Sequence, residues 1–231
     1  MYNKVINLDT VARVAEGLQE LRDEMVFIGG AVISLYTDDA AAEEIRPTQD
    51  VDLTINLGSG YYELVKMNER LSELGFNPTS EGKSICRYQF DKIDVDIMPA
   101  SDSVIGPSNR WYLPGFENLI PYTLDNGLTI NLLSAPYFLA TKLEAFKDRG
   151  NNDYRGSADF EDIIYVLDNR TTIVEEILNA NDEVKNFLKE ELSTIVDSAS
   201  ANEILSMHIH PLVVEERFPI LMEKIHYILE R

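Results

Sequence analysis

The feature that most constrains the fold is a short acidic motif, Asp50-Val51-Asp52, at the start of an alternating apolar run that ends at Leu57. Because side chains alternate along a strand, Asp50 and Asp52 are expected on one face, about 7 Å apart along the backbone. Val51 and Leu53 then face the protein interior. The pattern predicts a half-buried strand that presents two carboxylates on one surface.

A second acidic strand pattern covers residues 93–97, where Asp94 and Asp96 alternate with apolar residues. If this strand lies beside the first, several carboxylates gather on one surface, and their mutual repulsion favours bound cations. Hard divalent cations that prefer oxygen ligands, such as Mg2+ or Mn2+, suit such a site. An ordinary half-exposed strand shows the same alternation, so the metal-site interpretation depends on the presence of two such strands.

A glycine pair, Gly29-Gly30, follows the short apolar segment 25–28 and precedes a helix predicted over residues 31–35. A strand–glycine–helix arrangement brings backbone N–H groups toward an anion, and glycine lets a phosphate approach because it has no Cβ. Most Gly-Gly pairs are plain turns. The position of this pair just before the acidic strand is what favours phosphate binding.

Apolar spacing and turn signals predict the remaining elements. Helices are expected at residues 9–24, 58–74, 134–146 and 157–167, and in pieces from residue 171 onward. Strands are expected at residues 25–28, 50–57, 84–90, 93–98, 122–124 and 128–132. The last four strands are expected to form two hairpins, one around Asp91-Lys92 and one around Asn126-Gly127. The Asn-Gly dipeptide of the second hairpin favours a type I′ turn.

Composition limits the classes of function. The 231-residue chain has 20 Lys and Arg against 40 Asp and Glu, a net charge of -20, which argues against extended nucleic-acid binding. Nucleotide binding remains compatible, because distant charges are screened beyond about 8–10 Å. A single cysteine, Cys86, suits a reducing cytosol. Without a long apolar stretch or a signal-peptide core, no membrane span is expected and the cytoplasm is the expected location.

These motifs resemble the signature of polymerase-beta-type nucleotidyltransferases, which combines a glycine turn, a D-h-D strand and a third acidic residue on a neighbouring strand. The match is carried by Gly29-Gly30, by residues 46–52 (Arg-Pro-Thr-Gln-Asp-Val-Asp) and by Val95-Asp96. The R-x-T-x-D-h-D form is similar to the AbiEii-type nucleotidyltransferases, toxin components of bacterial toxin–antitoxin and abortive-infection systems. Residues 142–162 are similar to the family's K-x-x-A…R…D-h-x-D block, so the matching motifs span about residues 26–167.

The resemblance implies a fold and a set of metal ligands. The fold is an α+β nucleotidyltransferase domain over residues 1–133, a mixed sheet flanked by helices, with a helical C-terminal part over residues 134–231. The metal ligands and catalytic carboxylates are Asp50, Asp52 and Asp96. The family pattern of an aspartate between apolar residues favours Asp96 as the third carboxylate. Asp94 also lies between apolar residues, so the choice between them stays open.

The resemblance also assigns a group of residues to the nucleotide. It places Lys142 at the triphosphate, as a catalytic and nucleotide-binding residue, although a lysine whose amine reaches the surface would give the same pattern. Arg149 would bind the nucleotide too, or complement the C-terminus of its helix. Asp159 and Asp162 lie three residues apart, and one of them would orient Lys142 or the nucleotide, unless both belong to an exposed acidic face.

The remaining nucleotide-binding residues implied by the resemblance precede the acidic strand: Gly29, Gly30, Arg46 and Thr48. Arg46 and Thr48 would contact phosphate or fix the loop before Asp50. In one respect the chain departs from the wider superfamily, where many members have Gly-Ser at the position of Gly29-Gly30. The serine hydroxyl that contacts phosphate is therefore missing here.

The leading hypothesis is a Mg2+- or Mn2+-dependent nucleotidyltransferase that moves a nucleoside monophosphate from an NTP to an acceptor. That acceptor would be a hydroxyl of a protein, a tRNA or a small molecule, and a cognate antitoxin would be a partner. The alternatives are a non-catalytic nucleotide-binding or interaction protein with the same fold, and a regulatory, antitoxin-like protein. The full set of Asp50, Asp52 and Asp96 favours the enzyme, because a binding module need not keep every metal ligand. His208-Ile209-His210 has no nearby third ligand and is expected to be an ordinary loop.

Overall fold

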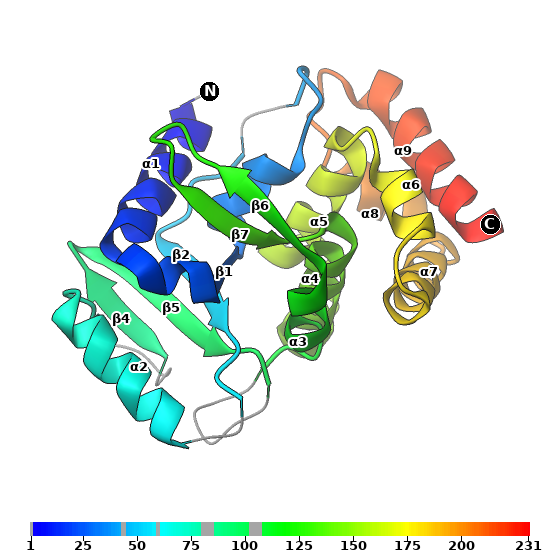
Figure 1. Cartoon of the computed structure of the whole chain (residues 1–231). Coiled ribbons are helices and arrows are strands. Elements are labelled where there is room, and N and C mark those ends of the chain that lie inside the picture. The colour runs from blue at the N-terminus through cyan, green and yellow to red at the C-terminus, as the bar shows by residue number, and fades with distance from the viewer. Residues whose placement is uncertain (1, 43–44, 59–60, 80–85, 102–107) are drawn as a thin grey trace. The chain divides into compact units, whose positions relative to one another are not determined.

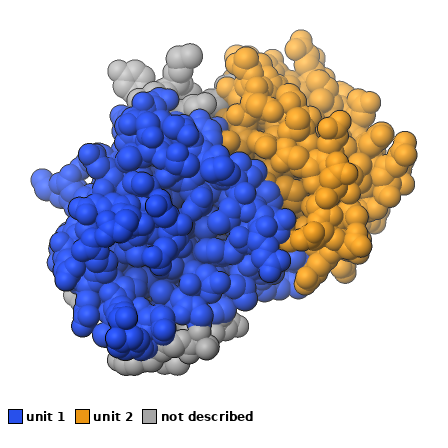
Figure 2. All heavy atoms as spheres, in the orientation of Figure 1, with its two compact units in different colours: residues 1–34, 44–134 blue, residues 35–43, 135–231 orange. Residues whose placement is uncertain are grey.

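The computed structural model describes residues 2–42, 45–58, 61–79, 86–101 and 108–231 (Figure 1). The chain divides into two compact units (Figure 2). Unit 1 contains residues 1–34 and 44–134, and unit 2 contains residues 35–43 and 135–231. The short segment 35–43 therefore joins the C-terminal helices, although it precedes the acidic strand in sequence.

Over the described residues, unit 1 is built on a mixed seven-stranded sheet with the order β3-β4-β5-β2-β1-β7-β6. The strands are β1 (Met25–Ile28), β2 (Asp50–Ile55), β3 (Asn77–Pro78), β4 (Arg87–Phe90), β5 (Ile93–Pro99), β6 (Leu119–Thr123) and β7 (Thr129–Leu133). Strand β2 pairs antiparallel with β1 and parallel with β5. The two acidic strands are therefore neighbours, and the α+β class predicted for the chain is confirmed.

Alternation of side chains explains how the two central strands present their carboxylates. Val51, Leu53 and Val95 have no exposed surface, whereas Asp50 and Asp96 are half-buried on the opposite side of their strands. Burying an aliphatic side chain stabilises a fold by about 1.5–3 kcal/mol, so a shift of one residue in register would be costly. The apolar residues thus fix the direction in which the aspartates point.

The helices of unit 1 differ in detail from the predicted ones. They are α1 (Tyr2–Gly17), α2 (Tyr61–Glu73), the short α3 (Tyr112–Gly115), and the 3₁₀ helices η1 (Gln19–Glu24) and η3 (Phe116–Asn118). The helix predicted over residues 9–24 is interrupted because Gln19 has a φ of 51°. The helix after the glycine pair is also a 3₁₀ helix, η2 (Gly30–Tyr36).

Both predicted hairpins form, but the two-residue turn with two positive φ values lies in the first hairpin and not in the second. Asp91 and Lys92 have φ values of 46° and 66°, the two positive values that a type I′ turn requires. At the second hairpin only Gly127 has a positive φ, so the type I′ turn predicted for Asn126-Gly127 is wrong. A wider turn closes there, in which the N–H of Gly127 donates to the carbonyl of Leu124 at 2.9 Å. Residues 84 and 85 of the predicted first strand lie outside the described residues.

Unit 2 is helical over its described residues: α4 (Ala135–Arg149), α5 (Ala158–Asn169), α6 (Ile173–Leu178), α7 (Asp182–Val196), α8 (Ala201–Ser206) and α9 (Val214–Glu230). Residues 35–42 pack among these helices, where Tyr36 stacks on Phe138 with ring centroids 4.1 Å apart. Arg217 of α9 holds the same segment through Asp39 and also pairs with Asp168 of α5. None of the described helices is both long enough and apolar enough to cross a lipid bilayer.

Candidate active site

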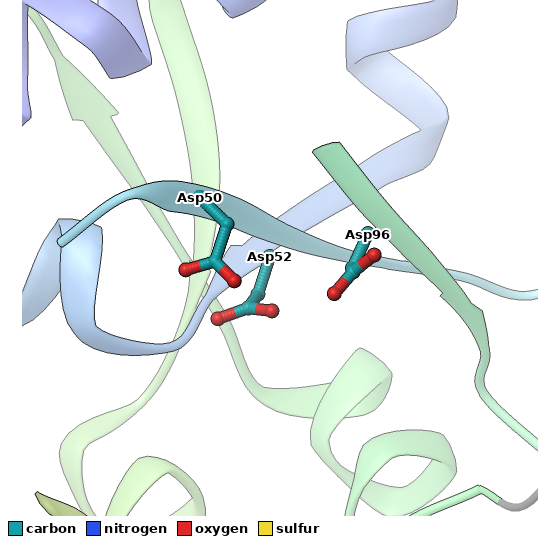
Figure 3. A group of neighbouring side chains, drawn as sticks. All are labelled: Asp50, Asp52 and Asp96. Carbon is teal, nitrogen blue, oxygen red and sulfur yellow. The ribbon is translucent and has the colours of Figure 1, made fainter. Parts of the chain in front are cut away.

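Three carboxylates from two neighbouring strands form the centre of the candidate site. Asp50 and Asp52 project from β2, and Asp96 lies directly opposite Asp52 on the parallel strand β5. One carboxylate oxygen of each residue lies within 4.8 Å of the other two. Figure 3 shows the three carboxylates turned toward one common space. Within the part of the chain that the structure describes, this is the one group of three or more potential metal ligands.

The alternative third carboxylate, Asp94, belongs to the same strand face but lies farther from the group. It is opposite Asp50 in register, and its side chain is 41% exposed, against 16% for Asp96. The geometry therefore groups Asp96 with Asp50 and Asp52. That these three bind a metal stays a prediction.

Arg87 of β4 contacts this group, and the sequence analysis did not identify it. Its Nε and Nη2 atoms donate to the two carboxylate oxygens of Asp96 at 2.8 and 2.6 Å, and Nη2 also donates to Asp50 at 3.2 Å. The hydrogen bonds to Asp96 raise the pKa of the Arg87 guanidinium, and they outweigh the opposing effect of burial. A signal was present in the sequence, because a two-residue turn at Asp91-Lys92 places Arg87 opposite Asp96.

The glycine pair lies against the same site. Gly29 has a φ of 75°, and a Cβ atom there would lie 2.0 Å from a carboxylate oxygen of Asp52. A Cβ atom on Gly30 would lie 2.8 Å from the methyl group of Thr48 and 3.4 Å from the guanidinium of Arg46. The structure thus brings together the glycine turn, the two predicted phosphate contacts and one carboxylate.

Asn7 of α1 fixes the loop that leads into β2. Its side chain is 1% exposed, its Nδ2 atom donates to the carbonyl of Arg46 at 3.3 Å, and its Oδ1 atom accepts from the N–H of Thr48 at 3.1 Å. A buried amide with both ends bonded to one loop restricts that loop strongly. Asn7 could not be identified from the sequence. Its partners lie about 40 positions later, and no local sequence pattern links Asn7 to them.

The other predicted nucleotide-binding residues lie in unit 2 and form an ionic cluster, in which Lys142, Asp159 and Asp162 are buried and Arg149 is exposed. The Nζ atom of Lys142 lies 2.7 Å from a carboxylate oxygen of Asp162 and 3.2 Å from one of Asp159. Lys142 is 7% exposed, so the surface-lysine alternative is wrong. Both aspartates are also buried, so the exposed acidic face considered for them is wrong as well.

Arg149 completes the cluster from the end of α4. Its Nε and Nη2 atoms donate to the two oxygens of Asp159 at 2.8 and 2.9 Å, a bidentate pair. Burial raises the pKa of Asp159, but the hydrogen bonds and charges of Arg149 and Lys142 outweigh it and lower the pKa overall. Asp159 therefore stays ionised at neutral pH and holds both cations.

His208 and His210 have structural contacts. A ring nitrogen of His208 lies 2.7 Å from the carbonyl oxygen of Tyr154, and the imidazole meets the Phe160 ring edge-on with centroids 5.4 Å apart. His210 accepts a hydrogen bond from the backbone of Leu212. These contacts agree with the loop interpretation.

Comparison with known proteins matches the chain over residues 14–208 to the model of a family described as "Nucleotidyl transferase AbiEii toxin, Type IV TA system". A search of curated proteins found no match. The family match covers every residue of the acidic group and of the Lys142 cluster, and Asn7 lies outside it. The mixed sheet flanked by helices agrees with the nucleotidyltransferase fold that this family implies. The chain therefore belongs to the AbiEii nucleotidyl transferase toxin family.

Proposed function

We propose that this chain is a divalent-metal-dependent nucleotidyltransferase that moves a nucleoside monophosphate from an NTP to an acceptor hydroxyl. The observation that carries the proposal is the group formed by Asp50, Asp52 and Asp96, whose oxygens lie within 4.8 Å of one another. Membership of the AbiEii family supports the reaction class and a role as a toxin with an antitoxin partner. The acceptor would be a protein, a tRNA or a small molecule.

The donor set fits a hard divalent cation. All three side chains offer carboxylate oxygens, which suit Mg2+ or Mn2+ better than softer metals that prefer sulfur or nitrogen. Asp50 and Asp52 would hold both ions of a two-metal site, and Asp96 would complete the site on the acceptor side. Bound ions would supply Lewis-acid stabilisation of the charge that develops on the phosphoryl oxygens. Asp96 would also accept the proton of the attacking hydroxyl.

Two further groups of residues would bind the nucleotide. In unit 1, Gly29, Gly30, Arg46 and Thr48 would contact phosphate. The close approach of Gly29 to Asp52, and of Gly30 to Thr48 and Arg46, supports this role. In unit 2, Lys142 and Arg149 would neutralise the triphosphate, with Asp159 and Asp162 holding the lysine in place. This role rests on the resemblance of residues 142–162 to the family's motif, because Asp159 and Asp162 already compensate for the burial of the Lys142 ammonium.

The proposal also includes a division of the chain into two domains. Residues 1–133 would form the nucleotidyltransferase domain, and residues 134–231 would form its helical C-terminal part. The cytoplasm is the proposed location, which the single cysteine, Cys86, supports.

The test is transfer of label from each of the four α-³²P-labelled NTPs to fractions of a bacterial lysate, with Mg2+ or Mn2+ and with an excess of chelator. We expect one labelled acceptor fraction, pyrophosphate release and loss of both with the chelator. Asp91→Asn, which changes an exposed carboxylate in the β4–β5 turn, is the control and should transfer label like the wild type. Binding of NTP without transfer to any fraction would favour the non-catalytic alternative.

A further inference from the structure

The guanidinium of Arg87 lies among three carboxylates. Besides its bidentate pair with Asp96, its Nη2 atom reaches Asp50 at 3.2 Å, and its Nη1 atom lies 3.7 Å from Asp94. The Arg87 side chain is 28% exposed, so solvent screens these contacts only in part. Arg87 thus supplies positive charge at the point where β2 and β5 bring their aspartates together.

The position of the Nη2 atom is the informative detail. It donates to one oxygen of Asp96 and to one oxygen of Asp50, so it bridges the two strands. A metal ion shared by Asp50 and Asp96 would need oxygen atoms of the same two carboxylates. A guanidinium on these oxygens and a divalent cation close to them would repel each other, because both are positive and the site is partly shielded from water.

We propose that Arg87 is the resident counter-ion of the acidic site, and that a divalent cation shared by Asp50 and Asp96 binds in competition with its guanidinium. The inference rests on the proposed function, because it concerns the metal site assigned there. In the metal-free protein Arg87 keeps the carboxylates close together by neutralising them. Metal binding then includes a movement of Arg87 away from Asp50.

Asp94 offers a place for the displaced guanidinium. It lies opposite Asp50 on β5, outside the group of three, and its carboxylate is already near Nη1 of Arg87. A rotation of the Arg87 side chain toward Asp94 would keep it paired while Asp96 and Asp50 become available to the metal. This gives Asp94 a defined role, namely to receive Arg87 rather than to bind metal.

The test is calorimetric titration of the full chain with MnCl2. Arg87→Gln should bind Mn2+ about tenfold more tightly than the wild type, the size expected when one competing charge-assisted hydrogen bond is removed. Its melting temperature without metal should fall, because three carboxylates lose their counter-ion. Arg87→Lys keeps the charge but lacks the paired Nε and Nη2 donors that bind both oxygens of Asp96, so its affinity for Mn2+ should lie between those of the wild type and Arg87→Gln. The control Arg13→Gln removes an exposed guanidinium that pairs with Asp91, and it measures the effect of net charge alone.

A second pair of variants tests the role of Asp94. Asp94→Asn should weaken Mn2+ binding relative to Asp91→Asn, because both remove one negative charge but only Asp94 receives Arg87. Equal affinities for this pair would overturn the role of Asp94.

The outcomes separate this inference from the proposed function. If the wild type binds Mn2+ and Arg87→Gln binds it equally or more weakly, Arg87 supports the site and the competition is overturned. Binding by Arg87→Gln and not by the wild type would support the competition in its strongest form. If neither protein binds Mn2+, the metal site of the proposed function fails and the competition fails with it.

Discussion

Gly29 packs so closely against Asp52 that a Cβ atom on the glycine would lie 2.0 Å from Oδ2 of the aspartate. The backbone of Gly29 also has a φ of 75°, a value that residues other than glycine rarely adopt. The glycine turn therefore does more than offer N–H groups to an anion. It forms one wall of the acidic site and limits the positions that the Asp52 carboxylate can take.

The first prediction follows from this contact. Gly29→Ala should lower the free energy of unfolding by more than the roughly 1–2 kcal/mol of left-handed backbone strain, because the methyl group also displaces Asp52. Gly127→Ala is the matched control, since Gly127 has a similar φ of 82° but nothing within 4 Å of a Cβ atom. Urea unfolding of both variants measures the difference. Equal losses of stability would show that the contact with Asp52 carries no weight.

The second prediction concerns metal binding by β2. Millimolar Mg2+ or Mn2+ should raise the melting temperature, because a ligand that binds the folded protein stabilises it by mass action. Asp50→Asn combined with Asp52→Asn should remove most of that rise. The double variant Asp91→Asn with Asp125→Asn removes two exposed carboxylates elsewhere and should keep it. An unchanged rise in the first double variant would place the metal at another site.

The central acidic strands could be predicted from the sequence, because local alternation fixes which way each side chain points. Asp50, Asp52 and Asp96 alternate with apolar residues that must be buried, and burial leaves the aspartates no other face. That β5 pairs with β2 came from the family resemblance. Alternation alone does not say which strands are neighbours.

The contacts made by Arg87 and Asn7 depend on longer-range geometry. Arg87 meets Asp96 across a hairpin, whereas Asn7 bonds a loop about 40 residues away, and no local pattern encodes that distance. The type I′ turn predicted at Asn126-Gly127 was wrong because the dipeptide alone does not fix the length of the loop. The loop there is wider than two residues, so only Gly127 needs a positive φ.

The third prediction tests the nucleotide role of Lys142. Lys142→Ala should weaken NTP binding by about 1.5–3 kcal/mol, as expected for one charge-assisted hydrogen bond, and the loss should be larger for the triphosphate than for the nucleoside. The variant should also be less stable, because Asp159 and Asp162 lose a buried partner. Lys147→Ala is the control, since this lysine of the same helix is about half exposed. Equal NTP affinity in calorimetry for Lys142→Ala and Lys147→Ala would leave Lys142 with a structural role only.

The last prediction separates Asp96 from Asp94 and the enzyme from a binding module. Asp96→Asn should lower the rate of label transfer by at least the roughly 10²–10⁴-fold typical of a lost general base, because the attacking oxygen must lose its proton there. NTP affinity should change much less, since Asp50 and Asp52 can still hold the ion on the nucleotide side. Asp94→Asn should be mild at saturating metal, because its more exposed carboxylate lies outside the group of three. Transfer of label from α-³²P-NTP measures all three proteins, and an inactive Asp94→Asn beside an active Asp96→Asn would reverse the assignment while leaving the fold unchanged.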